Sequence, residues 1–185
     1  MKFTSVIFKP LIKSGIFLVS IMLLTVSCEE TDELTRFDIE YEKSFTVPAT
    51  LGIDKPLSIP TPDITTNSGE KFSGKDTKKD LVEEIVMKKL DLTLQSPSDS
   101  DLSFLKSLTI YIDAEGMEET EIASKESVPD DIGQKLEMET TSADLKEYIF
   151  KDSFKLITEV TTDETISDNH EINASMVFTV DAEIL

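Results

Sequence analysis

The sequence predicts an all-β fold, an antiparallel two-sheet β-sandwich of the immunoglobulin-like or jelly-roll-like kind, with two short helices. Most of the chain beyond residue 36 consists of short segments in which apolar and polar residues alternate, which is typical of strands with one buried face. Turn signals separate these segments at short spacing, as they do in sandwiches. The linkers rarely leave room for a crossover helix, which favours antiparallel over parallel pairing.

The first strand is expected over residues 37–47, where apolar side chains occupy most alternate positions and Pro48 follows. Residues 57–59 lie between prolines, which cannot donate to a ladder, so this segment can form only an edge strand. Residues 63–79 are predicted to be a long polar loop that Phe72 anchors to the core.

A short helix is predicted over about residues 78–85, because Thr77 and Asp80 have capping-box spacing and apolar residues follow at helical intervals. The period then changes to two, which predicts a second long strand over residues 86–95. Met87 is expected on its outer face. The residues expected on its inner face are Val86, Lys88, Leu90, Leu92 and Leu94.

Three shorter strands are expected next. Residues 108–113 carry apolar side chains on both faces, which indicates a central position in a sheet. Gly116 suits the turn that follows, because glycine readily adopts a positive φ. A weaker strand is expected over residues 120–125, a turn over residues 129–133, and further alternation over residues 134–140.

A second short helix is predicted to run to about Phe150, because residues 141–144 repeat the capping-box pattern. Period two resumes over residues 154–160, and a polar loop is expected over residues 162–171. The clearest strand is the last one, over residues 172–184, where apolar side chains occupy every second position and all but one of the residues between them are polar.

The composition limits the functions that the chain can have. It contains 37 Asp and Glu against 18 Lys and Arg, which gives a net charge of −19. Phosphate backbones repel such a body, so we expect no nucleic-acid partner. The chain has one cysteine, Cys28, so no disulfide can form within it and the domain must be held together by its core.

The first residues have the composition of an export leader. The apolar stretch over residues 15–26 is shorter than the roughly 20 residues that a membrane-spanning helix needs and suits the core of a signal peptide. The basic residues before it are Lys2, Lys9 and Lys13. We therefore predict a signal peptide over residues 1–27, a flexible acidic tether over residues 28–36, and the β-sandwich over residues 37–185.

The residues Thr25-Val26-Ser27-Cys28 resemble the lipobox of bacterial lipoproteins, in which the cysteine thiol receives a diacylglycerol before cleavage. A small residue before the cut lets the peptidase close on the chain. The departure from the pattern is Thr25, where the family usually carries Leu, and it loosens the match to a particular peptidase. The acidic run after Cys28 resembles the signal that exports lipoproteins of Bacteroidota-type bacteria to the outer face of the outer membrane.

In general plan the chain is similar to small outer-membrane or surface lipoproteins of the Bacteroidota type. The resemblance implies lipidation of Cys28, a lipid bilayer as partner through the acylated cysteine, and a periplasmic or surface-exposed position in the cell envelope. Two or three acyl chains hold a protein stably on a bilayer. The alternatives are an ordinary signal peptide with an incidental cysteine, an uncleaved anchor helix, and an acidic run that is only a solvated spacer.

Side chains for catalysis and metal binding are scarce. Only His170 could serve as the imidazole base of a nucleophilic site, and we expect it in a surface loop without a function, so no catalytic residue is assigned. A zinc site needs several His or Cys ligands, whereas an all-carboxylate site suits calcium, the one cofactor left open. The candidate calcium ligands, which are otherwise ordinary solvated acids, are Asp99, Asp101, Asp113 and Glu115.

Together these observations favour a non-catalytic, lipid-anchored envelope protein, a binding, adhesion or structural module with a protein or glycan partner. One alternative is a calcium-dependent binding module. Another is a carboxylate-based hydrolase, since glycoside hydrolysis needs only two suitably spaced acids. The absence of Trp leaves little aromatic surface on which a sugar could stack.

Overall fold

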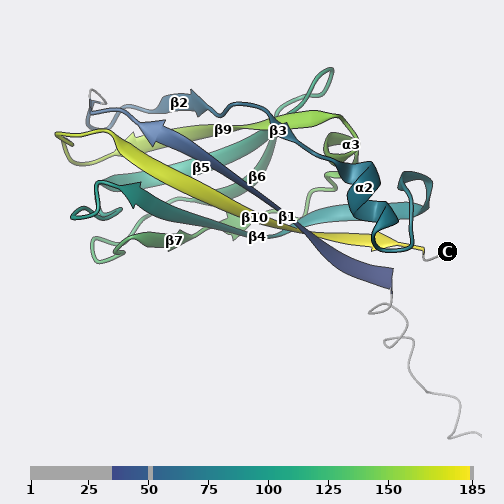
Figure 1. Cartoon of the computed structure of the whole chain (residues 1–185). Helices are drawn as coiled ribbons and strands as arrows, with labels where there is room; N and C mark the ends of the chain where they lie inside the picture. Colours follow the sequence, from purple (N-terminus) through teal and green to yellow (C-terminus); the bar gives the residue numbers. More distant parts are fainter. Residues whose placement is uncertain (1–34, 50–51, 184–185) are drawn as a thin grey trace, which may run out of the picture. The chain divides into compact units, whose positions relative to one another are not determined.

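A computed structural model describes residues 35–49 and 52–183 of the chain. The predicted signal peptide, Cys28 and most of the predicted tether lie outside these residues. The described part is an antiparallel two-sheet β-sandwich, which confirms the predicted fold class (Figure 1). No helix among the described residues is both long enough and apolar enough to cross a membrane.

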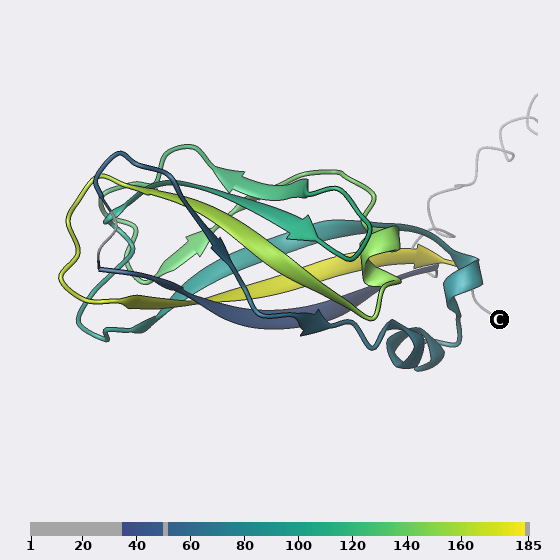
Figure 2. The same ribbon diagram turned by 90° about the horizontal axis from the view of Figure 1, so that it is seen from above.

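The first sheet has four strands in the order β1-β10-β4-β7, and every neighbouring pair is antiparallel. The strands are β1 (Arg36–Val47), β10 (His170–Ala182), β4 (Val82–Ser96) and β7 (Lys135–Glu137). Because β10 pairs over its whole length with β1 and with β4, it forms the centre of this sheet (Figure 2).

The second sheet has the order β2-β9-β5-β6-β8. Its strands are β2 (Leu57–Pro60), β9 (Ser153–Thr162), β5 (Leu105–Asp113), β6 (Thr120–Lys125) and β8 (Glu139–Thr140), and β3 (Ile64–Thr65) pairs with the start of β9. The helical segments are α2 (Ser68–Ser73), the single 3₁₀ turn η1 (Lys79–Leu81) and α3 (Lys146–Ile149).

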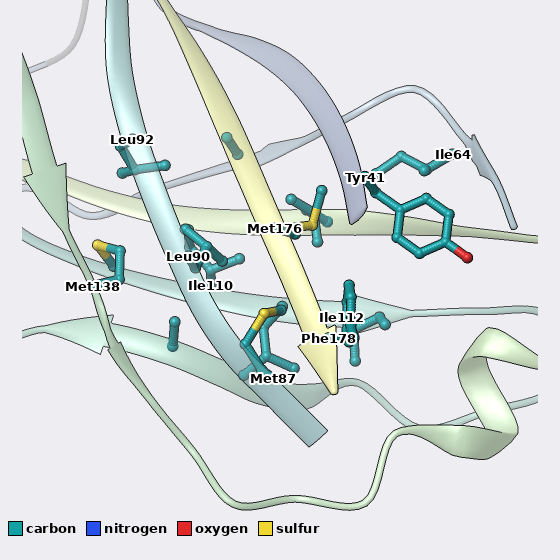
Figure 3. Close-up of a cluster of buried hydrophobic side chains, with 14 of the residues drawn as sticks. Tyr41, Ile64, Met87, Leu90, Leu92, Ile110, Ile112, Met138, Met176 and Phe178 are labelled. Atoms are coloured by element: carbon teal, nitrogen blue, oxygen red, sulfur yellow. The ribbon is translucent and has the colours of Figure 1, made fainter. Parts of the chain in front are cut away.

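The core lies between the inner faces of the two sheets, and part of it is shown in Figure 3. Phe178 of β10 is fully buried and makes edge-to-face contacts with Tyr41 of β1 and Phe154 of β9, at centroid distances of 5.7 and 6.2 Å. The Tyr41 hydroxyl donates to the carbonyl of Thr66 at 2.7 Å, and burial raises the pKa of this phenol. These contacts of Tyr41 and Phe178 therefore link the two sheets to each other and to the segment that contains Thr66.

The predicted helix over residues 78–85 is wrong. Only the three residues of η1 are helical, and β4 begins directly after them. Thr77 caps no helix, because its hydroxyl donates to the carbonyl of Glu183 at 2.6 Å. Ile85 is instead fully buried in β4, opposite Val180 of β10, so pairing and burial in the sheet outweigh the local helical spacing.

A bulge in β4 reverses the predicted faces of its first half. The register with β10 skips Lys88, which has no partner in the ladder. Met87 is therefore buried, whereas Lys88 and Lys89 are both exposed. The prediction that Val86 and Lys88 face the core is wrong: Val86 is only half-buried, and the extra residue keeps an unpaired ammonium group out of the apolar interior.

The segment over residues 63–79 is more ordered than the predicted loop, since it contains β3 and α2. Asn67 adopts a left-handed conformation (φ 47°) immediately before α2. Phe72 is fully buried, as expected, and makes edge-to-face contacts with Phe37 and Phe150 at 6.2 and 6.1 Å. This ring anchors the helix to the end of the sandwich.

The alternating segment over residues 134–140 forms two short strands instead of one. β7 joins the first sheet and β8 joins the second, and Met138 between them donates its N–H to the carbonyl of Leu90 at 3.0 Å. The chain thus changes sheets at this point. The second predicted helix is present as the short α3, but the predicted capping box is wrong, because α3 begins only at Lys146 and the hydroxyl of Thr141 donates to the carbonyl of Glu121 at 3.1 Å. The other predicted strands are confirmed as β1, β2, β5, β6, β9 and β10.

Thr158 on the inner face of β9 provides a test of this packing. Its side chain is fully buried, and its hydroxyl has no hydrogen-bond partner in the described part of the chain. Thr158→Val should raise the free energy of unfolding by about 1 kcal/mol, because it removes an unpaired polar group at nearly constant shape. Chemical denaturation measures this, with the half-exposed Thr161→Val as control; a loss of stability would contradict the assignment.

Candidate functional site

The outer face of the first sheet carries a hollow of about 710 Å³, which we call the polar trough. The middle of the hollow is lined by the short side chains of Ser175 and Thr93. Its flanks are lined by longer side chains of β1 and β7, such as Glu42 and Glu137. The residues that line the polar trough are Glu42, Lys89, Asp91, Thr93, Gln95, Ile132, Lys135, Leu136, Glu137, Asn173 and Ser175.

The strand register determines which of these side chains are neighbours. One row crosses all four strands through Glu42, Ser175, Asp91 and Glu137. The next row places Asn173 of β10 beside Thr93 of β4 and then Lys135 of β7. Directly opposed side chains in an antiparallel sheet are about 5 Å apart, so each row presents several polar groups to one ligand.

One ion pair organises the charges in the polar trough. The ammonium group of Lys89 lies 2.6 Å from a carboxylate oxygen of Asp91, and this hydrogen bond raises the pKa of Lys89. Lys89 follows the bulge at Lys88 and lies on the outer face, in alternation with buried Leu90. The bulge also exposes Lys88, whose ammonium group binds Asp38 at 2.7 Å and lowers the pKa of that carboxyl.

The wall beside β7 is partly apolar. Ile132 is half-buried and packs against the core, so its exposed part supplies a small apolar shelf at the rim, whereas Leu136 is almost fully buried. The remaining lining side chains are amides, hydroxyls, carboxylates and ammonium groups. This arrangement can donate and accept hydrogen bonds over a wide area and can pack one apolar face of a ligand against the shelf.

The structure separates the candidate calcium ligands into two places. Asp99 and Asp101 lie in the loop between β4 and β5, whereas Asp113 is the last residue of β5 and Glu115 follows it. This nine-residue strand spans about 30 Å. No group of three or more metal-ligating side chains occurs among residues 35–49 and 52–183.

The individual acids already have partners of their own. Asp101 accepts a hydrogen bond from the backbone N–H of Ser103 at 3.0 Å, and hydrogen bonding with Ser103 lowers the pKa of this carboxyl. Asp113 forms an ion pair with Lys155 at 2.9 Å, at the edge of a second hollow of about 460 Å³ that Glu115 also lines. A calcium ion at Asp113 would have to compete with this ammonium group.

His170 is not the surface-loop residue that the sequence predicted. It is the first residue of β10, and only 4% of it is exposed. Its Nδ1 lies 2.9 Å from the carbonyl of Asp168, which can only accept, so Nδ1 carries the proton and Nε2 accepts from the hydroxyl of Ser100 at 2.8 Å. The ring also packs on Phe104 at 4.4 Å.

His170 therefore joins the β9–β10 loop to the β4–β5 loop. A serine hydroxyl that donates to an imidazole is also the first half of a nucleophilic pair, but neither residue lines the two hollows described above. The burial of His170 could not be foreseen from a lone His between polar residues, because its contact with Ser100 joins positions that are 70 residues apart.

Comparisons with known proteins add little to this description. No family model matches the sequence, and no curated protein does. Among solved structures, a chain from Desmodium yellow mottle tymovirus is similar with a TM-score of 0.30 and 13% identity, over 81% of this chain and 90% of that chain. A TM-score this low supports no inference about function.

The separation of the acidic loops leads to a prediction about calcium. A ligand that binds only the folded state must raise the melting temperature. Because the candidate acids do not converge, the melting temperature should be the same in excess chelator and in millimolar calcium. Differential scanning calorimetry of the purified chain checks this, and a rise with calcium that Asp113→Asn abolishes would contradict it.

Proposed function

We propose that this chain is a lipid-anchored, non-catalytic protein of the bacterial cell envelope that binds a hydroxyl-rich ligand, a glycan, in the polar trough. The observation that carries the proposal is the trough itself, a broad hollow on a sheet face that is lined mostly by polar residues. Its volume lies within the range of roughly 300–1,000 Å³ that is typical of ligand sites.

The chemistry of the lining favours a glycan over a protein partner. A protein interface of high affinity is built around buried aromatic or other large apolar anchors, and the lining contains no aromatic side chain. Sugar hydroxyls, in contrast, both donate and accept, as the amides of Asn173 and Gln95 and the hydroxyls of Ser175 and Thr93 do. The C–H face of a sugar ring could pack on Ile132.

The charges restrict which glycans can bind. The lining contains three carboxylates, those of Glu42, Asp91 and Glu137, against two ammonium groups, and Lys89 is already paired with Asp91. The whole chain is strongly acidic. A ligand rich in carboxylate or sulfate would be repelled, so the proposed ligand is a neutral oligosaccharide.

Binding is favoured over hydrolysis by the placement of the acids. Glu42 and Glu137 lie on the two outer strands of a four-stranded sheet, so their backbones are about 14 Å apart. The carboxyl groups of inverting glycosidases are only about 6.5–9.5 Å apart. Asp91 is nearer to Glu137, but its carboxylate already binds Lys89.

A large side chain in the floor of the polar trough tests the proposed site. Ser175→Tyr should reduce binding at least tenfold by filling the space above Asp91, while the outward position leaves the core intact. Affinity electrophoresis in gels that contain neutral polysaccharides measures retardation. Thr109→Tyr, on the outer face of the second sheet, is the matched control. Equal retardation of all three proteins, or none with any neutral polysaccharide, would contradict the proposal.

The anchor requires a separate test, because Cys28 lies outside the described residues. Cells that express the chain and are fed radioactive palmitate should label it, and Cys28→Ser should abolish the label and leave the unprocessed, longer precursor. Gel autoradiography and the mass of the purified chain give both readouts. A wild-type product that is unlabelled, or that still carries residues 1–27, would remove the lipid anchor from the proposal.

A further inference from the structure

The outer edge of β1 leaves backbone hydrogen-bonding groups without partners. β1 is a terminal strand of the first sheet and pairs only with β10. In an antiparallel ladder, alternate residues of such a strand point their N–H and C=O groups away from the sheet. Figure 2 shows β1 (dark blue) at the rim of the sheet, with β10 (yellow) on its inner side.

Two contacts identify which residues point outward. The carbonyl of Glu40 accepts from Lys71 of α2 at 3.1 Å, so even-numbered residues of β1 face away from β10. On the other side of the sheet, the carbonyl of Leu90 in β4 accepts a hydrogen bond from the N–H of Met138, so the backbone groups of Leu90 face away from β10. Following the strand registers from β4 through β10 to β1 gives the same result, that even-numbered residues of β1 face away from β10. Odd-numbered residues of β1 therefore bond to β10, and their side chains face inward.

The first half of this edge is covered by a helix, whereas the second half runs near β2 without a backbone hydrogen bond to it. α2 lies against the first half, where Lys71 also stacks on the ring of Tyr41 at 4.6 Å. Beyond this point the outward groups are those of Glu42, Ser44 and Thr46. No hydrogen bond to their backbone groups from any other described residue occurs.

The side chains along this strand indicate what can dock there. Asp38, Glu40 and Glu42 are exposed on the outer face of β1, and two of the three carboxylates have no lysine on them in the described residues. A second copy of the chain, pairing antiparallel through β1, would bring acids opposite acids. Like charges directly opposite are destabilising, whereas opposite charges in cross-strand pairs are stabilising.

We propose that the open edge of β1, over residues 42–47, is a docking site for an extended basic segment of a partner protein, which would add to the sheet as a fifth strand. The backbone groups of Glu42, Ser44 and Thr46 form the new ladder. The exposed carboxylates of Glu40 and Glu42 pair with lysine or arginine side chains of the added strand. This surface is distinct from the polar trough, which it meets only at Glu42.

The experiment uses two synthetic decapeptides as probes, one of alternating Lys and Val (the Lys-Val peptide) and one of the same sequence in which every backbone nitrogen is methylated (the N-methylated peptide). Both carry the same charge, but only the first keeps the backbone N–H groups that an added strand donates along an extended edge. Each is added to the purified full-length chain, and amide hydrogen exchange is measured at single-residue resolution by mass spectrometry. The Lys-Val peptide should slow exchange at Glu42, Ser44 and Thr46 roughly tenfold, and leave Lys43 and Phe45 unchanged.

Ser44→Pro provides the matching variant. The N–H of Ser44 points away from β10, so proline there removes a docking group without removing a bond of the β1–β10 ladder. Ser44→Pro should abolish the protection and Ser44→Ala should keep it, with slow exchange at Lys43 and Phe45 in both as evidence of folding. Glu42→Lys should weaken binding of the Lys-Val peptide.

Three results would overturn the proposal. The first is equal protection by the N-methylated peptide, which would indicate attraction by charge alone. The second is undiminished protection in a folded Ser44→Pro. The third is protection of Glu42, Ser44 and Thr46 without any peptide, accompanied by dimers in native mass spectrometry, which would make a second copy the occupant of the edge.

Discussion

The structure depends on β10, a strand that is buried on one face and paired along both edges. Its inward side chains from Ile172 to Ala182 are all at most 1% exposed, and its backbone is bonded to β1 on one side and to β4 on the other. Burying this apolar row of Ile, Ala, Met, Phe and Val against the second sheet supplies much of the hydrophobic stabilisation of the domain. The neighbouring strands, and hence both proposed surfaces, take their register from it.

The polar trough and the open edge both follow from the period-two geometry of this sheet. Ser175 of β10 and Thr93 of β4, which alternate with buried residues, present short side chains in the middle of the polar trough. The alternation that turns Phe45 of β1 inward also turns the backbone groups of Ser44 outward. Because both side chains and backbone groups alternate in direction along a strand, the same strands contribute to the core, the polar trough and the unpaired edge.

Charged and polar side chains lie at places where the strands depart from this regular alternation. The bulge at Lys88 places this lysine on the outer face beside Lys89, and the two bind Asp38 and Asp91. At the start of β10, buried His170 uses both ring nitrogens to join two loops. In each case a polar group that would be costly in the interior receives a partner or reaches solvent.

The sequence by itself determined the fold class and most of the strands, because apolar alternation is a local signal that records which face is buried. It could not determine the bulge at Lys88, the sheet change at Met138 or the strand conformation of Ile85, since each depends on pairing with residues far along the chain. The polar trough likewise exists only once Glu42, Asp91, Glu137 and Ser175 stand side by side. Tertiary structure decided these features because the neighbours of a strand are chosen by burial of the whole sheet, not by local sequence.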